Sequence, residues 1–74
     1  NEPDIISQIS ADEILKAMQK LTPSYRTVLN LNVVEGYSHR EIAKELGITE
    51  STSRSNLVKA RGKLRAAIQV MYKN

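Results

Sequence analysis

Two Ser-x-x-Glu sequences, at residues 10–13 and 38–41, constrain the fold of this chain more than any other feature, because each fixes the start of a helix. In such a capping box the serine hydroxyl accepts a hydrogen bond from the glutamate amide, and the glutamate carboxylate accepts one from the serine amide. Thr22-Pro23 indicates a third start, because proline fits the first helical position, where its missing N–H costs nothing. Thr49 is a favoured N-cap residue and indicates a fourth.

Apolar residues follow each start at spacings of three and four, which is the pattern of one helix face. The predicted inward faces are Ile14, Leu15, Met18 and Leu21, then Tyr25, Val28, Leu29, Leu31, Asn32 and Val33, then Ile42, Ala43 and Leu46, and finally Leu57, Ala60, Leu64, Ile68 and Met71. Gly36 and Gly47 are predicted to end the second and third helices in a left-handed conformation. No segment alternates with period two. We therefore expect an all-α domain of four helices, or five if the N-terminal tail adds one.

The 74 residues are expected to form one small domain, with residues 1–9 as a tail or linker and residues 10–74 as the folded unit. The chain has no cysteine, which excludes disulfides and Cys-ligated zinc, and a single histidine cannot form a metal site alone. We expect no metal and no cofactor. No apolar run approaches the roughly 20 residues that cross a bilayer, and no signal-peptide pattern is present, so we expect a cytoplasmic protein. Residues 1–4 are expected to mark a cut inside a longer protein.

Positive charge is concentrated in the second half of the chain. Residues 1–38 carry three basic and five acidic residues, a net charge of −2, whereas residues 39–74 carry eight basic and three acidic residues, a net charge of +5. This asymmetry favours a polyanionic partner, because neutralising phosphates releases counterions and drives association. The charge alone is equally compatible with a solvated basic face.

Residues 38–57, S-H-R-E-I-A-K-E-L-G-I-T-E-S-T-S-R-S-N-L, have the pattern of a helix-turn-helix. Ala43 is small where two helices must approach, Gly47 allows the positive φ of a tight turn, and Ile48 is an apolar residue that can fill the angle between the helices. The first turns of the following helix have a polar outer face that suits the major groove of DNA. The residues of this face are Glu50, Ser51, Arg54, Ser55, Val58 and Lys59. A helical hairpin used only for packing is the alternative.

Residues 21–65 resemble, without a gap, region 4 of extracytoplasmic-function (ECF) sigma factors, most tellingly in the segments Val34-Glu35-Gly36-Tyr37-Ser38 and Lys59-Ala60-Arg61. The family usually has an apolar residue where Ser53 stands, so a hydroxyl is expected near the core face of the recognition helix. The resemblance implies a DNA-binding domain that recognises the −35 promoter element within a sigma subunit and directs transcription initiation. It does not imply an enzyme, and the sequence shows no paired carboxylates, phosphate-binding glycine loop or catalytic triad.

The resemblance also implies which residues contact DNA. The outer face defined above would lie in the major groove, with Asn56 beside it. Arg54 and Lys59 can donate to guanine or phosphate, and Val58 can contact a thymine methyl group. His39 and Arg40 match positions at which the family contacts the phosphate backbone, which fixes orientation without specifying sequence.

The remaining side chains of the set have less specific chemistry. Ser55 suits a base edge or a phosphate, and a serine such as Ser51 is also ordinary on an exposed helix. Glu50 can accept from a cytosine amine, or it can instead only balance the positive start of the helix. Arg61, Lys63 and Arg65 are expected to face solvent or to reach flanking phosphates.

The partners implied by the resemblance are promoter DNA, the β-flap of the RNA polymerase core and an anti-sigma factor, with the domain acting as a monomer. A LuxR-type response-regulator output domain, which binds DNA as a dimer, shares the E-I-A-x-x-L-G-I core and is the closest alternative. Residues 21–26 and 59–61 favour the sigma factor. A helical module that binds only polymerase or an anti-sigma factor is a further alternative, although such a module would not need Arg54 and Lys59 on an outer face.

Overall fold

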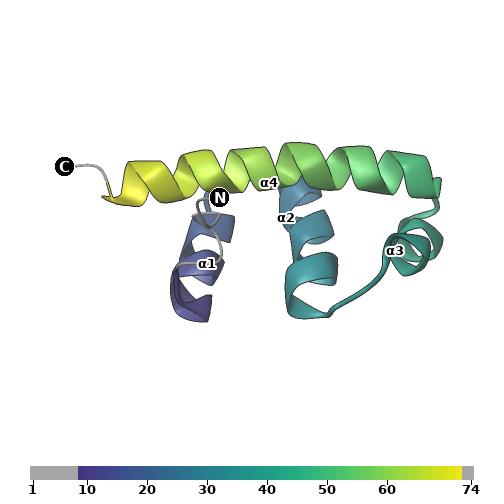
Figure 1. Ribbon diagram of the computed structural model, residues 1–74, viewed down its shortest axis with the longest axis horizontal. Helices are drawn as coiled ribbons and strands as arrows, with labels where there is room; N and C mark the ends of the chain where they lie inside the picture. Colours follow the sequence, from purple (N-terminus) through teal and green to yellow (C-terminus); the bar gives the residue numbers. More distant parts are fainter. Residues whose placement is uncertain (1–8, 73–74) are drawn as a thin grey trace, which may run out of the picture.

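A helix of 23 residues, α4 (Glu50–Tyr72), carries the three shorter helices of the domain along one side (Figure 1). The computed structural model describes residues 9–72. The elements before α4 are α1 (Ala11–Met18), α2 (Pro23–Leu29) with its π-helical continuation η2 (Asn30–Val34), and α3 (His39–Leu46). Figure 1 shows α1 near the C-terminal end of α4, α2 near its middle and α3 near its N-terminal end. No strand occurs in the described residues, so the predicted all-α fold with four helices is confirmed.

Both predicted capping boxes are present. The amide of Glu13 donates to the hydroxyl of Ser10 at 3.2 Å, and the amide of Ser10 donates to the carboxylate of Glu13 at 3.1 Å. At α3 the corresponding distances between Ser38 and Glu41 are 3.2 and 2.9 Å. These local contacts satisfy amides that have no partner inside a helix, so the starts of α1 and α3 lie where the sequence places them.

The other predicted helix ends are stabilised by different local interactions. Thr49 caps α4 through its hydroxyl, which accepts from the amide of Thr52 at 3.0 Å. Thr22 occupies the N-cap position of α2, but its side chain makes no capping bond, and the start of α2 relies on proline at the first helical position and on backbone bonds. Gly36 and Gly47 have φ values of +73° and +68°, which confirms the predicted left-handed residues after the second and third helices.

The capping carboxylate of α3 makes the stability of the domain dependent on pH. Hydrogen bonds from the amide and then the hydroxyl of Ser38 hold the pKa of Glu41 below its usual value of 4.5. A depressed carboxyl pKa stabilises the fold above the unfolded pKa, and that contribution is lost as the pH falls through the folded pKa. We therefore expect acidification from pH 6 to pH 3 to lower the melting temperature more in the parent chain than in Glu41→Gln.

Glutamine preserves the capping geometry without a titrating group, so Glu41→Gln isolates the charge. Melting followed by circular dichroism across this pH range is the measurement. Glu45→Gln, on the same helix but outside the capping box, is the control. If the melting temperatures of the parent chain and Glu41→Gln depend equally on pH, the cap of α3 does not contribute to that dependence.

The core is a single cluster centred on α4. Side chains of α1, α2 and α4 form it together, and the buried members are Ala17, Met18, Val28, Leu29, Leu57, Ala60, Leu64 and Ile68. Ile42 and Ala43 of α3 are also buried, at the end of the molecule where α3 packs on α4. Of the predicted tail at residues 1–9, only Ile9 is described, and it packs against this core. Residues 1–8, and with them a possible fifth helix, lie outside the described residues, as do residues 73–74.

Three residues predicted to face inward are exposed. Leu15, Val33 and Leu46 leave 43%, 36% and 36% of their surfaces accessible. Leu15 lies at the edge of the α1 face, whose buried centre includes Ala17, and Leu46 is the last residue of α3, where the chain turns at Gly47.

Val33 is exposed for another reason, which is the π-helical turn of η2. The amide of Glu35 donates to the carbonyl of Asn30, five residues earlier, at 3.0 Å. A π turn holds more residues than an α turn, so the side chains that follow are rotated away from the face that α2 establishes. The predicted face therefore ends before η2, which contributes no fully buried residue.

Asn32 in η2 links the second helix to the start of α3. Its side-chain amide donates to the carbonyl of Tyr37 at 3.1 Å, and the amide of Tyr37 donates to the carbonyl of Leu31 at 2.9 Å. Because Tyr37 directly precedes the N-cap of α3, these bonds hold the entry to α3 against η2. This hydrogen bond explains why the polar residue Asn32 occupies a face predicted to point inward.

Candidate DNA-binding surface

The unit formed by α3, a tight turn and the start of α4 lies at one end of the molecule (Figure 1). Gly47 makes the turn in a left-handed conformation, and the amide of Ile48 donates to the carbonyl of Ala43 at 3.0 Å. Ala43 is buried as predicted, and Ile48 in the turn is half-buried. Two helices joined by a turn of this kind are the geometry of a helix-turn-helix.

The first turns of α4 present a polar surface to solvent and an apolar surface to the domain. Ser53 and Leu57 are buried on the inner side, and Asn56 is half-buried at the edge. Six of the exposed side chains form the surface that we call the recognition face, and they are Glu50, Ser51, Arg54, Ser55, Val58 and Lys59. All six predicted outer residues are therefore exposed together on α4, and none of them is needed for the core.

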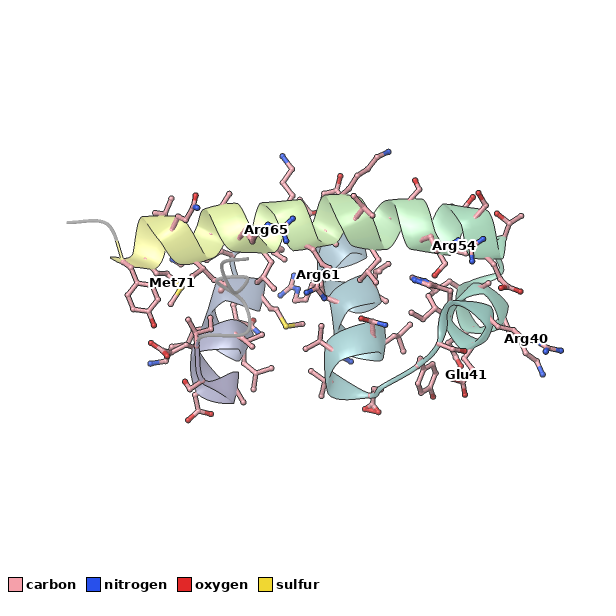
Figure 2. All side chains as sticks on the ribbon, viewed as in Figure 1. Arg40, Glu41, Arg54, Arg61, Arg65 and Met71 are labelled. Carbon is pink, nitrogen blue, oxygen red and sulfur yellow. The ribbon has the colours of Figure 1, made fainter. Side chains whose placement is uncertain are left out.

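Basic side chains from two helices lie at this end of the molecule. Figure 2 shows Arg54 at the N-terminal end of α4 and Arg40 on the adjacent α3, with Arg40 directed away from the body of the domain. Arg54 lies 3.9 Å from the carboxylate of Glu50, and the two side chains are 58% and 52% exposed. An exposed pair at this distance contributes little to stability. Arg54 can therefore exchange Glu50 for another anion at small cost.

His39 makes a contact that the sequence did not reveal. Its Nδ1 lies 3.0 Å from the hydroxyl oxygen of Ser53 on α4, and Ser53 is fully buried. The expectation of a hydroxyl near the core face of α4 is thus correct, but its partner is not visible in the sequence. The two residues are fourteen positions apart, and the angle between α3 and α4 brings them together.

Arg61 and Arg65 are less exposed than side chains that simply face solvent. Both are half-buried and each has an interaction partner, and whether they reach flanking phosphates stays a prediction. In Figure 2 Arg61 lies on the side of α4 that carries α1 and α2. A long arginine side chain can cover apolar surface with its methylene groups while its charged end remains satisfied. Lys63 is exposed as predicted.

Residues 9–72 contain neither a candidate metal site nor a membrane-spanning helix. The acidic and histidine side chains of this part form no group of three or more that could hold a metal ion. None of its helices combines the length and the apolar character needed to span a membrane.

A helix-turn-helix whose second helix exposes polar and basic side chains beside a basic neighbour defines a DNA-binding domain. Residues 11–64 match a family model described as sigma-70, region 4, and the chain belongs to that family. Region 4 is the helix-turn-helix of sigma factors that binds the −35 promoter element, and it is not an enzyme. This match confirms the resemblance to region 4, of the kind typical of ECF sigma factors, and decides against the LuxR-type alternative.

A curated relative agrees with this assignment. The chain is 32% identical over 56 residues to the RNA polymerase sigma factor SigZ of Bacillus subtilis (strain 168). The alignment covers 76% of this chain and 32% of SigZ, so the chain spans about a third of the length of that relative.

Proposed function

We propose that this chain recognises the −35 element of promoters as one domain of a sigma factor bound to RNA polymerase in the cytoplasm. The observation that supports the proposal best is the recognition face, whose six side chains are all exposed on the helix that follows the turn. The second helix of a helix-turn-helix enters the major groove with its first residues against base edges. The recognition face spans these first turns of α4.

Three side chains of the recognition face have clear chemistry toward base pairs. Arg54 and Lys59 can donate to guanine or phosphate oxygens, and the weak pair with Glu50 restrains Arg54 little. Val58 is 69% exposed, and it offers contact to a thymine methyl group. Glu50, Ser51, Ser55 and Asn56 complete the surface as hydrogen-bonding groups.

His39 and Arg40 serve a different purpose in this proposal. They are the first two residues of α3, at the same end of the molecule as Arg54. Donors at this place suit the phosphate backbone beside the groove. Such contacts fix how the domain sits on DNA and carry no sequence information themselves.

We further propose that the domain, as a monomer, docks on the β-flap of polymerase through an apolar hollow between α1 and η2. The hollow has a volume of about 290 Å³ and is lined by Ala11, Ile14, Leu15, Val33 and Val34. Leu15, Val33 and Val34 are the large apolar side chains that this part of the domain leaves exposed. An anti-sigma factor that covered the hollow would compete with polymerase.

A nuclear magnetic resonance titration of the ¹⁵N-labelled chain tests both contacts. The probes are a DNA duplex selected by the chain from a random pool and a peptide of the β-flap tip. We expect the duplex to shift amides of the recognition face and the start of α3, and the peptide to shift amides around the hollow. Val34→Asp should remove the response to the peptide and keep the response to DNA, because Val34 is exposed and outside the core.

Val70→Asp places the same charge on an exposed valine near the end of α4 and is the matched control. A peptide response that survives Val34→Asp would contradict docking at the hollow. A duplex that shifted only residues outside α3 and the recognition face would contradict the proposed DNA surface.

A further inference from the structure

The contact between His39 and Ser53 joins a buried group to the proposed DNA surface. Ser53 has no accessible surface, and its hydroxyl oxygen lies 3.0 Å from Nδ1 of His39. His39 is half-buried and is the first residue of α3. A buried hydroxyl on α4 thus holds a side chain that we have proposed as a phosphate ligand.

The burial of Ser53 determines which ring nitrogen carries the proton. A hydroxyl that water cannot reach needs an acceptor for its hydrogen, because an unsatisfied buried donor is costly. Within residues 9–72, Nδ1 of His39 is the partner of this hydroxyl. If the hydroxyl donates to Nδ1, the ring accepts there, and a neutral imidazole that accepts at Nδ1 carries its proton on Nε2.

The same contact sets the direction of the ring. The two nitrogens of imidazole lie on opposite edges, so a ring held at Nδ1 by a buried hydroxyl directs Nε2 away from the core. An N–H donor is what a phosphate oxygen requires, and an unprotonated nitrogen would repel it. The contact orients His39 and also gives it the correct tautomer.

We propose that Ser53 is a positioning residue for DNA binding, which holds His39 in the Nε2–H tautomer so that Nε2 donates to the phosphate backbone. The inference rests on the proposed contact between His39 and phosphate. It adds that Ser53 allows a neutral His39 ring to make this contact. Ser53 itself touches no DNA.

The test compares Ser53→Thr with Ser53→Val, two side chains of the same shape of which only threonine keeps the hydroxyl. Any packing cost of the larger side chain applies to both, and circular dichroism melting checks that both fold. We expect Ser53→Thr to bind the selected duplex about as tightly as the parent and Ser53→Val to bind about two- to tenfold more weakly, the loss typical of one hydrogen bond. Equal affinity of the two variants would overturn the proposal.

The ring nitrogens of His39 provide a readout that a purely structural role would not change. In the ¹⁵N spectrum of the unsubstituted chain at a pH where the ring is neutral, we expect the pattern of the Nε2–H tautomer. Ser53→Thr should preserve this pattern, and Ser53→Val should give a mixture of tautomers. An Nδ1–H ring in the unsubstituted chain would overturn the proposal without any variant.

His39→Ala separates this inference from the contact on which it rests. If His39→Ala leaves DNA affinity unchanged, the phosphate contact is wrong and the inference falls with it. If His39→Ala weakens binding, Ser53→Val should cause no further loss in the His39→Ala background, because the two substitutions remove the same interaction. A full additional loss there would show that Ser53 acts through packing and would overturn the inference.

Discussion

Leu64→Ala should lower the melting temperature of the domain by about 8–40 °C, since truncating a buried leucine costs about 2–5 kcal/mol and each kcal/mol shifts the midpoint of a small domain by about 4–8 °C. Leu64 is fully buried in the cluster that joins α1, α2 and α4. The net stability of a domain of this size is on the order of 4–11 kcal/mol. One cavity therefore removes a large share of the folding free energy.

Thermal unfolding followed by far-ultraviolet circular dichroism measures this effect. Lys63→Ala is the matched control, because Lys63 is the preceding residue of α4 and is exposed. Alanine favours helix at both positions, so the difference between the variants reports the cavity alone. Equal melting temperatures for the two variants would contradict the placement of α4 at the centre of the core.

Arg54→Ala should weaken binding to the selected duplex about 5- to 150-fold, which corresponds to about 1–3 kcal/mol for a good contact between arginine and a base. Arg54 is exposed on the recognition face, and its pair with Glu50 is weak, so the substitution should leave the melting temperature nearly unchanged. Fluorescence anisotropy at a fixed salt concentration is the measurement. The salt must be fixed because phosphate contacts make affinity fall steeply with ionic strength.

The control for Arg54→Ala is Lys16→Ala, which removes one positive charge from α1, near the opposite end of the molecule (Figure 1). If Arg54 contacts a base, Arg54→Ala should relax the sequence preference at one base pair. A phosphate contact instead reduces the salt slope by about 0.9 and leaves preference intact. Lys59→Ala tests in the same way whether Lys59, in the second half of the recognition face, contacts a base or a phosphate. If Arg54→Ala binds as tightly as Lys16→Ala, the recognition face is assigned to the wrong side of α4.

The sequence predicted helix ends well because their causes are local. Ser38 and Glu41 satisfy each other's amides within four residues, and Gly47 needs no distant partner to adopt a left-handed conformation. The prediction that the last helix runs to about residue 71 agrees with α4, which is described up to Tyr72. The exposure of the recognition face also follows from helical periodicity, since the opposite side of α4 supplies the core.

Features that depend on tertiary geometry were not predictable in the same way. No residue type in Asn30–Val34 signals a π turn, so Val33 was placed on the wrong side of its helix. The departure at Ser53 indicated a buried hydroxyl, but its contact with His39 requires the angle between α3 and α4. The DNA contacts of individual side chains remain predictions, because they depend on how the domain sits in the groove.

The length of α4 bears on the distance between the proposed polymerase contact and the proposed DNA contact. At about 1.5 Å per residue, its 23 residues extend about 35 Å, which is close to one full turn of DNA. α3 packs near one end of this helix and α1 near the other (Figure 1). A continuous helix cannot shorten without breaking its hydrogen bonds, so the length of α4 is fixed. If polymerase docks beside α1, as proposed above, the length of α4 would set how far from the enzyme the recognised base pairs lie.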